Sequence, residues 1–389
     1  MQKNPILRLA CALLCCALCM GVLCLQTNAL TCRVTPTAPV FAGSAVLVEA
    51  QSGRVLYEQH AHTRMPMAST TKIMTALVVL EYCDLQATVS IDARAVGTEG
   101  SSVYLCPEER LTVEQLLYAL MLSSANDAAA ALAFEVAGSI EGFAALMNQK
   151  AQELGLVNTH FANPHGLDAK GHYTTAYDLA CMTAYALENE DFLRIVSTQK
   201  KVIPLREQEG ARVLRNHNKL LASYEGCIGV KTGFTKKSGR CLVSAAERDG
   251  VRLICVTLDC PDDWRTHTTL LDDGFAALER VDLTLANAHV TSLPVVGGTQ
   301  TQLYLQTNAA VSVILPREHG EIECRIEGAH FVYAPIEQGT HVADAVWTLD
   351  GEEIARAPLF ATYGVENPTA KRTPFGWLRA LLNKLKELL

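Results

Sequence analysis

The chain changes its hydrophobic pattern once, at about residue 281, and this change restricts it to two units of different class. From residues 38 to 280 helical and strand-like patterns alternate, and Ser52-Gly53 and Asp249-Gly250 predict β-hairpin turns. Between these turns, "TKIMTALVVLEYC" is apolar on nearly every side, which predicts a helix buried in the core. Strands at both ends of a helical middle predict an α+β fold in which helices cover an antiparallel sheet.

The second unit, residues 281–362, consists of short β-type runs separated by turn residues. Asp350-Gly351 predicts a hairpin within the last of these runs. We therefore expect a small all-β domain, then a linker at residues 363–373 and a terminal segment at residues 374–389. A chain of 389 residues is long enough for a large core with such a satellite domain.

Residues 1–29 have the pattern of a secretory signal. A basic start precedes an apolar run at residues 9–25, and the small residue Ala29 predicts the cleavage site. An uncleaved N-terminal anchor is the alternative. The leader carries basic but no acidic residues, so its removal makes the net charge more negative than the -8 of the whole chain. An acidic body argues against nucleic acid as a partner.

Cysteine use gives no sign of a metal or redox centre. Five of the 14 cysteines lie in the leader, and the others form no CxxC pair. Four of the others lie in apolar runs and are expected to be small buried hydrophobic residues: Cys83, Cys181, Cys241 and Cys255. Disulfide pairing among the mature cysteines stays open. Because no nucleotide-binding loop is present either, we expect no cofactor.

The stretch "MPMASTTKIM" contains a Ser-x-x-Lys motif at Ser69 and Lys72. A serine before an apolar run usually caps a helix, but a capping box has Glu or Gln three residues later. Lys72 has the wrong charge for that end of the helix dipole. Residues i and i+3 share one helix face, so the two side chains can meet there. Ser197 and Lys200 repeat the spacing, but in a segment with strand-like alternation.

The Ser69–Lys72 pair suits nucleophilic catalysis. A serine hydroxyl becomes a good nucleophile when a neighbouring base takes its proton, and Lys72 can act as this base only while it is neutral. Burial, the helix N-terminus and a second lysine at position 231 would all lower the pKa of Lys72. The charge that is unfavourable for a helix start therefore has a chemical use.

Two further motifs follow in order, Ser124-Ala125-Asn126 and Lys231-Thr232-Gly233. We expect Ser124 to relay a proton to the leaving group and Asn126 to hold the substrate amide. The third motif, Lys231-Thr232-Gly233, is expected at a strand edge.

At that edge, Lys231 and Thr232 would donate hydrogen bonds to a substrate carboxylate. Gly233 would let the substrate backbone approach the strand. The backbone N–H groups of Ser69 and Phe234 are the expected donors of an oxyanion hole.

With these motifs, "PMASTTKIMTAL", "SANDAA", "NPHGLD", "YTTAYDLA" and "GVKTGFTKKSGRCLV" resemble segments of the low-molecular-mass penicillin-binding proteins, the serine-type D-alanyl-D-alanine carboxypeptidases. The resemblance implies the penicillin-binding-protein/serine β-lactamase-like fold. It also implies removal of the terminal D-alanine from peptidoglycan stem peptides through an acyl-enzyme on Ser69, and acylation by β-lactam antibiotics. The family has an arginine after the KTG strand that binds the terminal carboxylate, and "PDDWRTHTT" supplies Arg265 for that role. "YAPIEQGTHVADAVWTLDGEEIARAPLFA" is similar to the family's C-terminal β domain.

Other functions remain as alternatives. A serine β-lactamase shares the three motifs but uses a Glu to activate water, and no Glu-x-x-Leu-Asn segment follows Ser124. A peptidoglycan DD-endopeptidase would use the same motifs. A non-catalytic binding protein would not need every chemical residue intact. His165 and Asp178 are expected to be structural, the first in a turn and the second at a helix start.

The C-terminal stretch predicts a membrane-associating amphipathic helix at residues 374–389. Its apolar residues recur at helical spacing: Trp377, Leu378, Leu381, Leu382, Leu385, Leu388 and Leu389. The opposite face is mostly basic or polar, as in helices that lie in the plane of the membrane surface. A helix packed on the β domain is the alternative. Together with the leader, this pattern predicts an exported protein held at the outer face of the cytoplasmic membrane.

Overall fold

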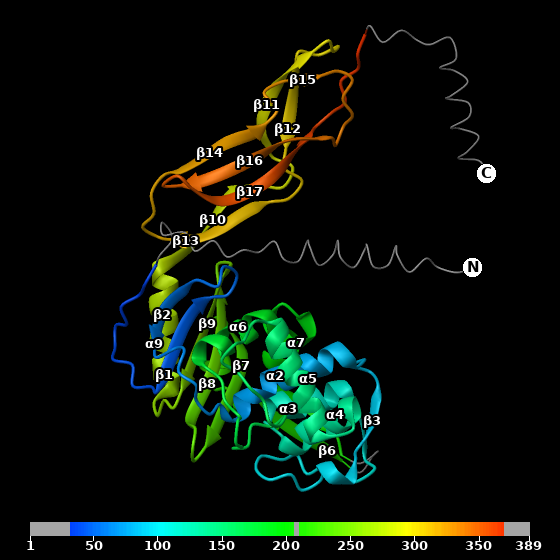
Figure 1. Cartoon of the computed structure of the whole chain (residues 1–389), viewed down its shortest axis with the longest axis vertical. Coiled ribbons are helices and arrows are strands. Elements are labelled where there is room, and N and C mark those ends of the chain that lie inside the picture. The colour runs from blue at the N-terminus through cyan, green and yellow to red at the C-terminus, as the bar shows by residue number, and fades with distance from the viewer. Residues whose placement is uncertain (1–31, 206–209, 369–389) are drawn as a thin grey trace, which may run out of the picture. The chain divides into compact units, whose positions relative to one another are not determined.

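The structure is a computed structural model that describes residues 32–205 and 210–368. The predicted leader at residues 1–29 and the predicted helix at residues 374–389 lie outside the described residues. The described chain forms two compact units, which divide between Glu279 and Arg280 (Figure 1).

A five-stranded antiparallel sheet forms the centre of the first unit, in the order β2-β1-β9-β8-β7. Its strands are β1 (Ser44–Glu49), β2 (Val55–Gln59), β7 (Cys227–Thr235), β8 (Gly239–Arg248) and β9 (Val251–Leu258). Both predicted hairpins are confirmed, because β1 pairs with β2 and β8 with β9. Asp249 and Gly250 adopt the positive φ angles that a two-residue hairpin turn requires. Strand β7 lies at one edge of the sheet, and this edge borders the site described below.

Helices cover both faces of this sheet (Figure 1). The helices are α2 (Lys72–Tyr82), α3 (Val113–Leu122), α4 (Asn126–Ala137), α5 (Ile140–Glu153), α6 (Ala176–Leu187), α7 (Glu190–Val196), α8 (Leu220–Ser223) and α9 (Asp263–Ala277). Side chains alternate across a strand, so β1 serves both layers. Leu47 lies against Gly274 of α9, whereas Val46 and Val48 join the core formed with the other helices. The predicted antiparallel sheet covered by helices is confirmed.

The helical middle is built around α2, which is buried along most of its length as its apolar sequence predicted. Short elements complete the unit: η2 (Ala68–Thr71), β3 (Thr88–Ser90), η3 (Ala93–Ala95), β4 (Arg110–Thr112), β5 (Lys200–Pro204) and β6 (Ala211–Arg215). The Ala- and Leu-rich helical region does not run continuously, since residues 123–125 separate α3 from α4. Of the four cysteines expected in the core, Cys241 and Cys255 are fully buried, and Cys83 and Cys181 are half-buried at its margin.

The second unit is all-β, as predicted. A six-stranded sheet has the order β14-β16-β17-β12-β11-β15, and β10 pairs with β13. The strands are β10 (Leu278–Thr284), β11 (His289–Val296), β12 (Gln302–Gln306), β13 (Val311–Pro316), β14 (Ile322–Gly328), β15 (Val332–Tyr333), β16 (His341–Leu349) and β17 (Glu352–Ala361). Asp350 and Gly351 form the expected turn between β16 and β17, both with positive φ.

Within residues 32–205 and 210–368, no single helix is both long and apolar enough to cross a membrane. Only α4 and α5 counted together reach that length and apolarity, and they meet at an angle of 83°.

Candidate active site

Ser69 lies in the short turn η2, immediately before α2, where the buried helix begins. Its hydroxyl caps neither element, so Ser69 does not have the usual helix-capping role of a serine at this position. The turn is held instead by Thr70 and Thr71, whose hydroxyls donate to the carbonyls of Met67 and Ala68 at 2.6 and 2.7 Å. The Ser69 hydroxyl thus remains available for chemistry.

Lys72 is fully buried, and its amine contacts three oxygen atoms. Its Nζ lies 2.9 Å from Ser69 Oγ, 2.6 Å from Asn126 Oδ1 and 2.5 Å from the His165 carbonyl. An amide oxygen and a backbone carbonyl can only accept hydrogen bonds. When the amine is neutral, these two acceptors engage its two hydrogens and leave the lone pair for the Ser69 hydroxyl proton.

The surroundings of Lys72 favour this neutral form. Burial lowers the pKa of Lys72 well below its ordinary value, the charge of Lys231 lowers it further, and Asp127 opposes the shift. The prediction that burial and the second lysine depress this pKa is therefore supported by the geometry.

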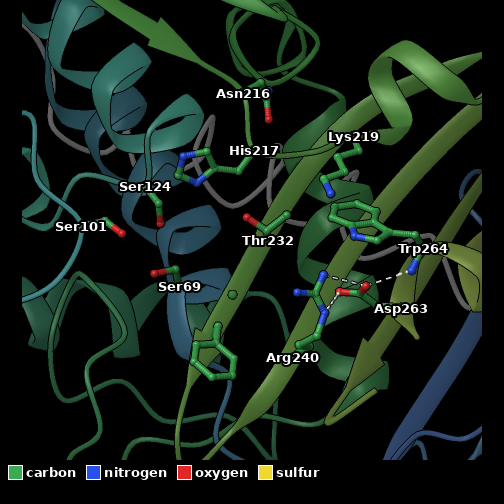
Figure 2. Close-up of a pocket in the computed structure, with 12 residues that line it drawn as sticks. Ser69, Ser101, Ser124, Asn216, His217, Lys219, Thr232, Arg240, Asp263 and Trp264 are labelled. Atoms are coloured by element: carbon green, nitrogen blue, oxygen red, sulfur yellow. Dashed lines mark hydrogen bonds and ion pairs between the residues drawn. The ribbon is translucent and has the colours of Figure 1, made fainter. Parts of the chain in front are cut away.

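The second motif forms the link between α3 and α4. Ser124 adopts a positive φ of 57°, which is rare for a residue with a side chain. Figure 2 shows its hydroxyl facing Ser69 across the cleft. Its Oγ makes no hydrogen bond to any described residue.

Asn126 contacts the base directly. Its Oδ1 accepts from Lys72 and its Nδ2 donates 2.6 Å to the Glu99 carbonyl, so both ends of the amide are engaged by the protein. It does not line the cleft. Asn126 therefore orients the base in this structure, and its role in holding the substrate amide stays a prediction.

The third motif lies on β7, the edge strand. Lys231 is buried, and desolvation lowers its pKa to about 7. Its Nζ donates to the Thr232 carbonyl at 3.0 Å. The glycine that follows is required by close packing, because a Cβ at Gly233 would stand 3.1 Å from the Ser69 nitrogen. Strand β7 can therefore lie directly beside the Ser69 turn.

These elements enclose a cleft of about 570 Å³, a volume typical of small-ligand sites (Figure 2). Its lining residues are Ser69, Ser101, Ser124, Asn216, His217, Lys219, Thr232, Gly233, Phe234, Arg240, Asp263 and Trp264. Five predicted site residues line it: Ser69, Ser124, Thr232, Gly233 and Phe234. Three other predicted site residues are buried and do not line it: Lys72, Asn126 and Lys231.

Arg265, by contrast, is not among the residues that line the cleft, and its contact with a substrate carboxylate stays a prediction. Its side chain is 69% exposed, and its Nε pairs with Asp262 Oδ2 at 2.6 Å. The preceding residues Asp263 and Trp264 do line the cleft. Successive residues of a helix point about 100° apart, so the side chain of Arg265 turns away from the wall that its two neighbours form.

The guanidinium that lines the cleft belongs to Arg240, which sequence reasoning missed. Arg240 lies on β8 directly opposite Phe234. Its Nε and Nη2 donate to the Asp263 carboxylate at 3.1 and 2.8 Å, while Nη1 has no hydrogen-bond partner within the described chain. A predicted hairpin from β7 to β8 could have identified this residue, because such a hairpin places Arg240 beside the strand that carries Lys231-Thr232-Gly233.

The "NPHGLD" loop packs beneath the nucleophile. A Cβ at Gly166 would fall 1.9 Å from the Ala68 carbonyl oxygen, so only glycine allows this approach. The neighbouring His165 contributes its carbonyl to Lys72, while its Nδ1 accepts from the Leu167 N–H. Burial first and the Lys72 charge second lower the pKa of His165 to about 3, so its ring stays neutral. The prediction that the side chain is structural agrees with this placement.

The remaining candidates lie outside the cleft. Asp178 accepts from Asn158 N and Thr159 Oγ1 at 2.9 and 2.8 Å, a structural role, and Thr175 is the cap of that helix. Ser197 closes α7, and the strand-like segment begins only at β5. Among the described residues, no group of three or more His, Cys, Asp or Glu side chains could hold a metal ion.

Comparison with known proteins agrees with this geometry. The family model described as D-alanyl-D-alanine carboxypeptidase matches residues 32–262, and the model described as penicillin-binding protein 5, C-terminal domain, matches residues 279–367. The chain is 35% identical to the D-alanyl-D-alanine carboxypeptidase DacF of Bacillus subtilis, over 82% of this chain and 85% of that protein. It is 33% identical to DacC of Escherichia coli, over 87% and 88% of the two chains. Penicillin binding protein 5 from Haemophilus influenzae has a similar solved structure, with a TM-score of 0.66 and 28% identity over 86% of this chain and 99% of that one.

Proposed function

The chain belongs to the D-alanyl-D-alanine carboxypeptidase family, and we propose that it removes the terminal D-alanine from peptidoglycan pentapeptides through an acyl-enzyme on Ser69. The observation that carries the residue assignment is the 2.9 Å contact between Ser69 Oγ and the buried Lys72 amine at the floor of the cleft. Incubating the purified protein with a peptide ending in D-Ala-D-Ala and measuring released D-alanine tests the activity. Measuring penicillin hydrolysis in parallel separates it from a β-lactamase.

In the proposed acylation, Lys72 Nζ takes the Ser69 proton as Oγ attacks the carbonyl carbon of the penultimate D-alanine. The carbonyl oxygen becomes an oxyanion held by the N–H groups of Ser69 and Phe234. The closeness of Gly233 to the Ser69 nitrogen supports this pairing of donors.

Collapse of the tetrahedral intermediate breaks the peptide bond. The proton held by Lys72 then passes through the Ser124 hydroxyl to the departing D-alanine amine, a role supported by the unpaired Oγ of Ser124 facing Ser69 (Figure 2). In deacylation, water attacks the ester carbonyl carbon while Lys72 accepts its proton. Collapse of this second tetrahedral intermediate breaks the ester C–O bond, and the proton passes from Lys72 to Ser69 Oγ as the shortened peptide leaves.

The terminal carboxylate is proposed to bind where β7 meets the basic wall of the cleft. Thr232 offers a hydroxyl there, Lys231 supplies positive charge from beneath, and Arg240 offers its unpaired Nη1. Asp263 fixes the plane of the guanidinium and partly offsets its charge. We therefore assign to Arg240 the carboxylate contact that family resemblance assigned to Arg265.

Replacing Arg240 by glutamine should lower kcat/KM for a D-Ala-D-Ala peptide by about tenfold to a hundredfold, because a hydrogen bond to an ionised group is worth roughly 1.5–3 kcal/mol. Arg265→Gln is the matched control and should stay within about twofold of the parent enzyme. An Arg265→Gln variant that loses activity while Arg240→Gln retains it would show that Arg265, and not Arg240, contacts the terminal carboxylate.

We further propose that the mature protein is exported and held at the outer face of the cytoplasmic membrane by residues 374–389. The support is the sequence pattern alone: an apolar stripe with Trp377, and a basic opposite face that suits an anionic lipid surface. This segment is shorter and more charged than a membrane-spanning helix.

Deleting residues 373–389 should release the mature enzyme into the soluble fraction with carboxypeptidase activity intact. High salt alone should release the intact protein only partly, because screening weakens the charge attraction but leaves the apolar stripe in the interface. Fractionation and D-alanine release measure the two outcomes. A truncated protein that stays with membranes, or that unfolds, would show that the segment belongs to the fold.

A further inference from the structure

Tyr104 is an exposed aromatic residue held in an unusual backbone conformation close to the cleft. Its side chain is 82% exposed, and its φ is +56°. Positive φ is an outlier for a bulky residue, and such strain collects at ligand-binding sites. Tyr104 lies three residues after Ser101, which lines the cleft. Three residues of chain reach at most about 10 Å, so the backbone of Tyr104 lies within that distance of a residue that lines the cleft.

Two buried ionic groups hold this residue in place. The buried Asp127 carboxylate accepts from Ser102 Oγ at 2.6 Å and from the Leu105 N–H at 3.0 Å. On the other side, Arg212 donates to the Tyr104 carbonyl at 3.1 Å and is itself paired with Glu109 in the interior.

The backbone of Tyr104 is therefore fixed on both sides, although its ring makes no aromatic contact within the described residues. A fixed backbone lowers the entropy lost when such a ring binds a ligand.

The direction of the proposed substrate leads toward this ring. Figure 2 shows Arg240 and Ser101 on opposite sides of Ser69. If the terminal carboxylate lies at Arg240 and the scissile carbonyl at Ser69, the acyl part of the peptide must leave on the Ser101 side.

We propose that Tyr104 binds the stem peptide upstream of its D-Ala-D-Ala end and so favours long stem peptides over short analogues. This inference rests on the proposed function, because it takes its direction from the carboxylate position. Tyr104 acts here as a substrate-binding residue remote from the reacting atoms.

The test compares a tripeptide and a stem pentapeptide, both ending in D-Ala-D-Ala, with the full mature enzyme. Tyr104→Gly removes the ring but suits the positive φ, so the loop keeps its conformation and the melting temperature should hold or rise. We expect kcat/KM for the pentapeptide to fall about fivefold to tenfold, mainly through KM. Activity on the tripeptide and the rate of penicillin acylation should change less than twofold.

Tyr104→Phe should behave like the parent enzyme, since a contact by the ring needs no hydroxyl. Tyr82→Ala is the matched control, because Tyr82 is an exposed tyrosine at the far end of α2. Equal losses on both substrates would show a structural role for Tyr104, and unchanged selectivity would show no role; either result overturns the inference.

A binding measurement separates this inference from the proposed reaction. In a Ser69→Ala background, adding Tyr104→Gly should weaken the pentapeptide Kd about fivefold by calorimetry and leave the tripeptide Kd unchanged. An unchanged pentapeptide Kd would refute the role of Tyr104. Absence of D-alanine release by the parent enzyme would instead refute the proposed reaction.

Discussion

Replacing Ser69 by alanine should abolish covalent labelling by a fluorescent penicillin and lower D-alanine release by at least about 10⁴-fold. The hydroxyl is the atom that forms the acyl-enzyme, and loss of a nucleophile that works with its base removes the whole covalent path. The fold should survive, because the Ser69 side chain caps neither η2 nor α2. Gel fluorescence and a D-alanine assay measure the two losses.

Ser197→Ala supplies the matched control for this experiment. Ser197 shares the Ser-x-x-Lys spacing, but it closes α7 and its hydroxyl donates to the Arg194 carbonyl at 3.3 Å. Labelling and D-alanine release should both stay near the parent values. Labelling that is lost in Ser197→Ala but kept in Ser69→Ala would reverse the assignment of the nucleophile.

Replacing Lys72 by methionine should lower the rate of acylation by about 10²–10⁴-fold, the usual contribution of a positioned general base. Methionine keeps a long unbranched side chain in the buried site but cannot accept the Ser69 proton. It also leaves the Asn126 and His165 oxygens without their shared donor. Stopped-flow acylation by penicillin measures the loss, and a thermal melt checks that the variant folds.

The pH dependence of the parent enzyme should carry the signature of this base. Burial holds the pKa of Lys72 well below its ordinary value of 10.5, so the neutral, reactive fraction grows as pH rises through that lowered pKa. The rate of acylation should therefore rise at a lower pH than an ordinary lysine would allow, and Lys72→Met should lose this rise.

Substrate binding should weaken with rising pH, in contrast to the acylation rate, because of Lys231. Desolvation brings its pKa to about 7, so its charge is lost above that pH and KM for a free-carboxylate peptide should increase. For the acylation step, the outcome that would contradict the role of Lys72 is a rate in the unsubstituted enzyme that begins to rise only near pH 10.5.

The site combines several features that disfavour folding by themselves. Lys72 and Lys231 are buried amines, and Ser124 has a positive φ. Each is expected to lower the free energy of unfolding, because desolvation disfavours a charged amine and the left-handed region disfavours a side chain. Their coincidence around Ser69 is typical of a reactive site held in place by a surrounding rigid fold.

Local chemistry allowed much of this protein to be predicted from its sequence. The turns at Asp249-Gly250 and Asp350-Gly351 are determined by residues that tolerate positive φ, and a segment apolar on nearly every side identified the buried α2. The spacing of Ser69 and Lys72 was enough to bring their side chains together, because three residues along a helical start lie on one face. Such features depend on neighbours in the chain.

The surroundings of Asn126, Arg240 and Arg265 were decided by the tertiary structure. The Asn126 amide orients Lys72 because a carbonyl 27 residues earlier occupies its other end. A rotation of about 100° per helical residue turns Arg265 outward, while the register between β7 and β8 brings Arg240 to the cleft. These outcomes depend on how distant elements pack, which the local sequence pattern of either arginine does not determine.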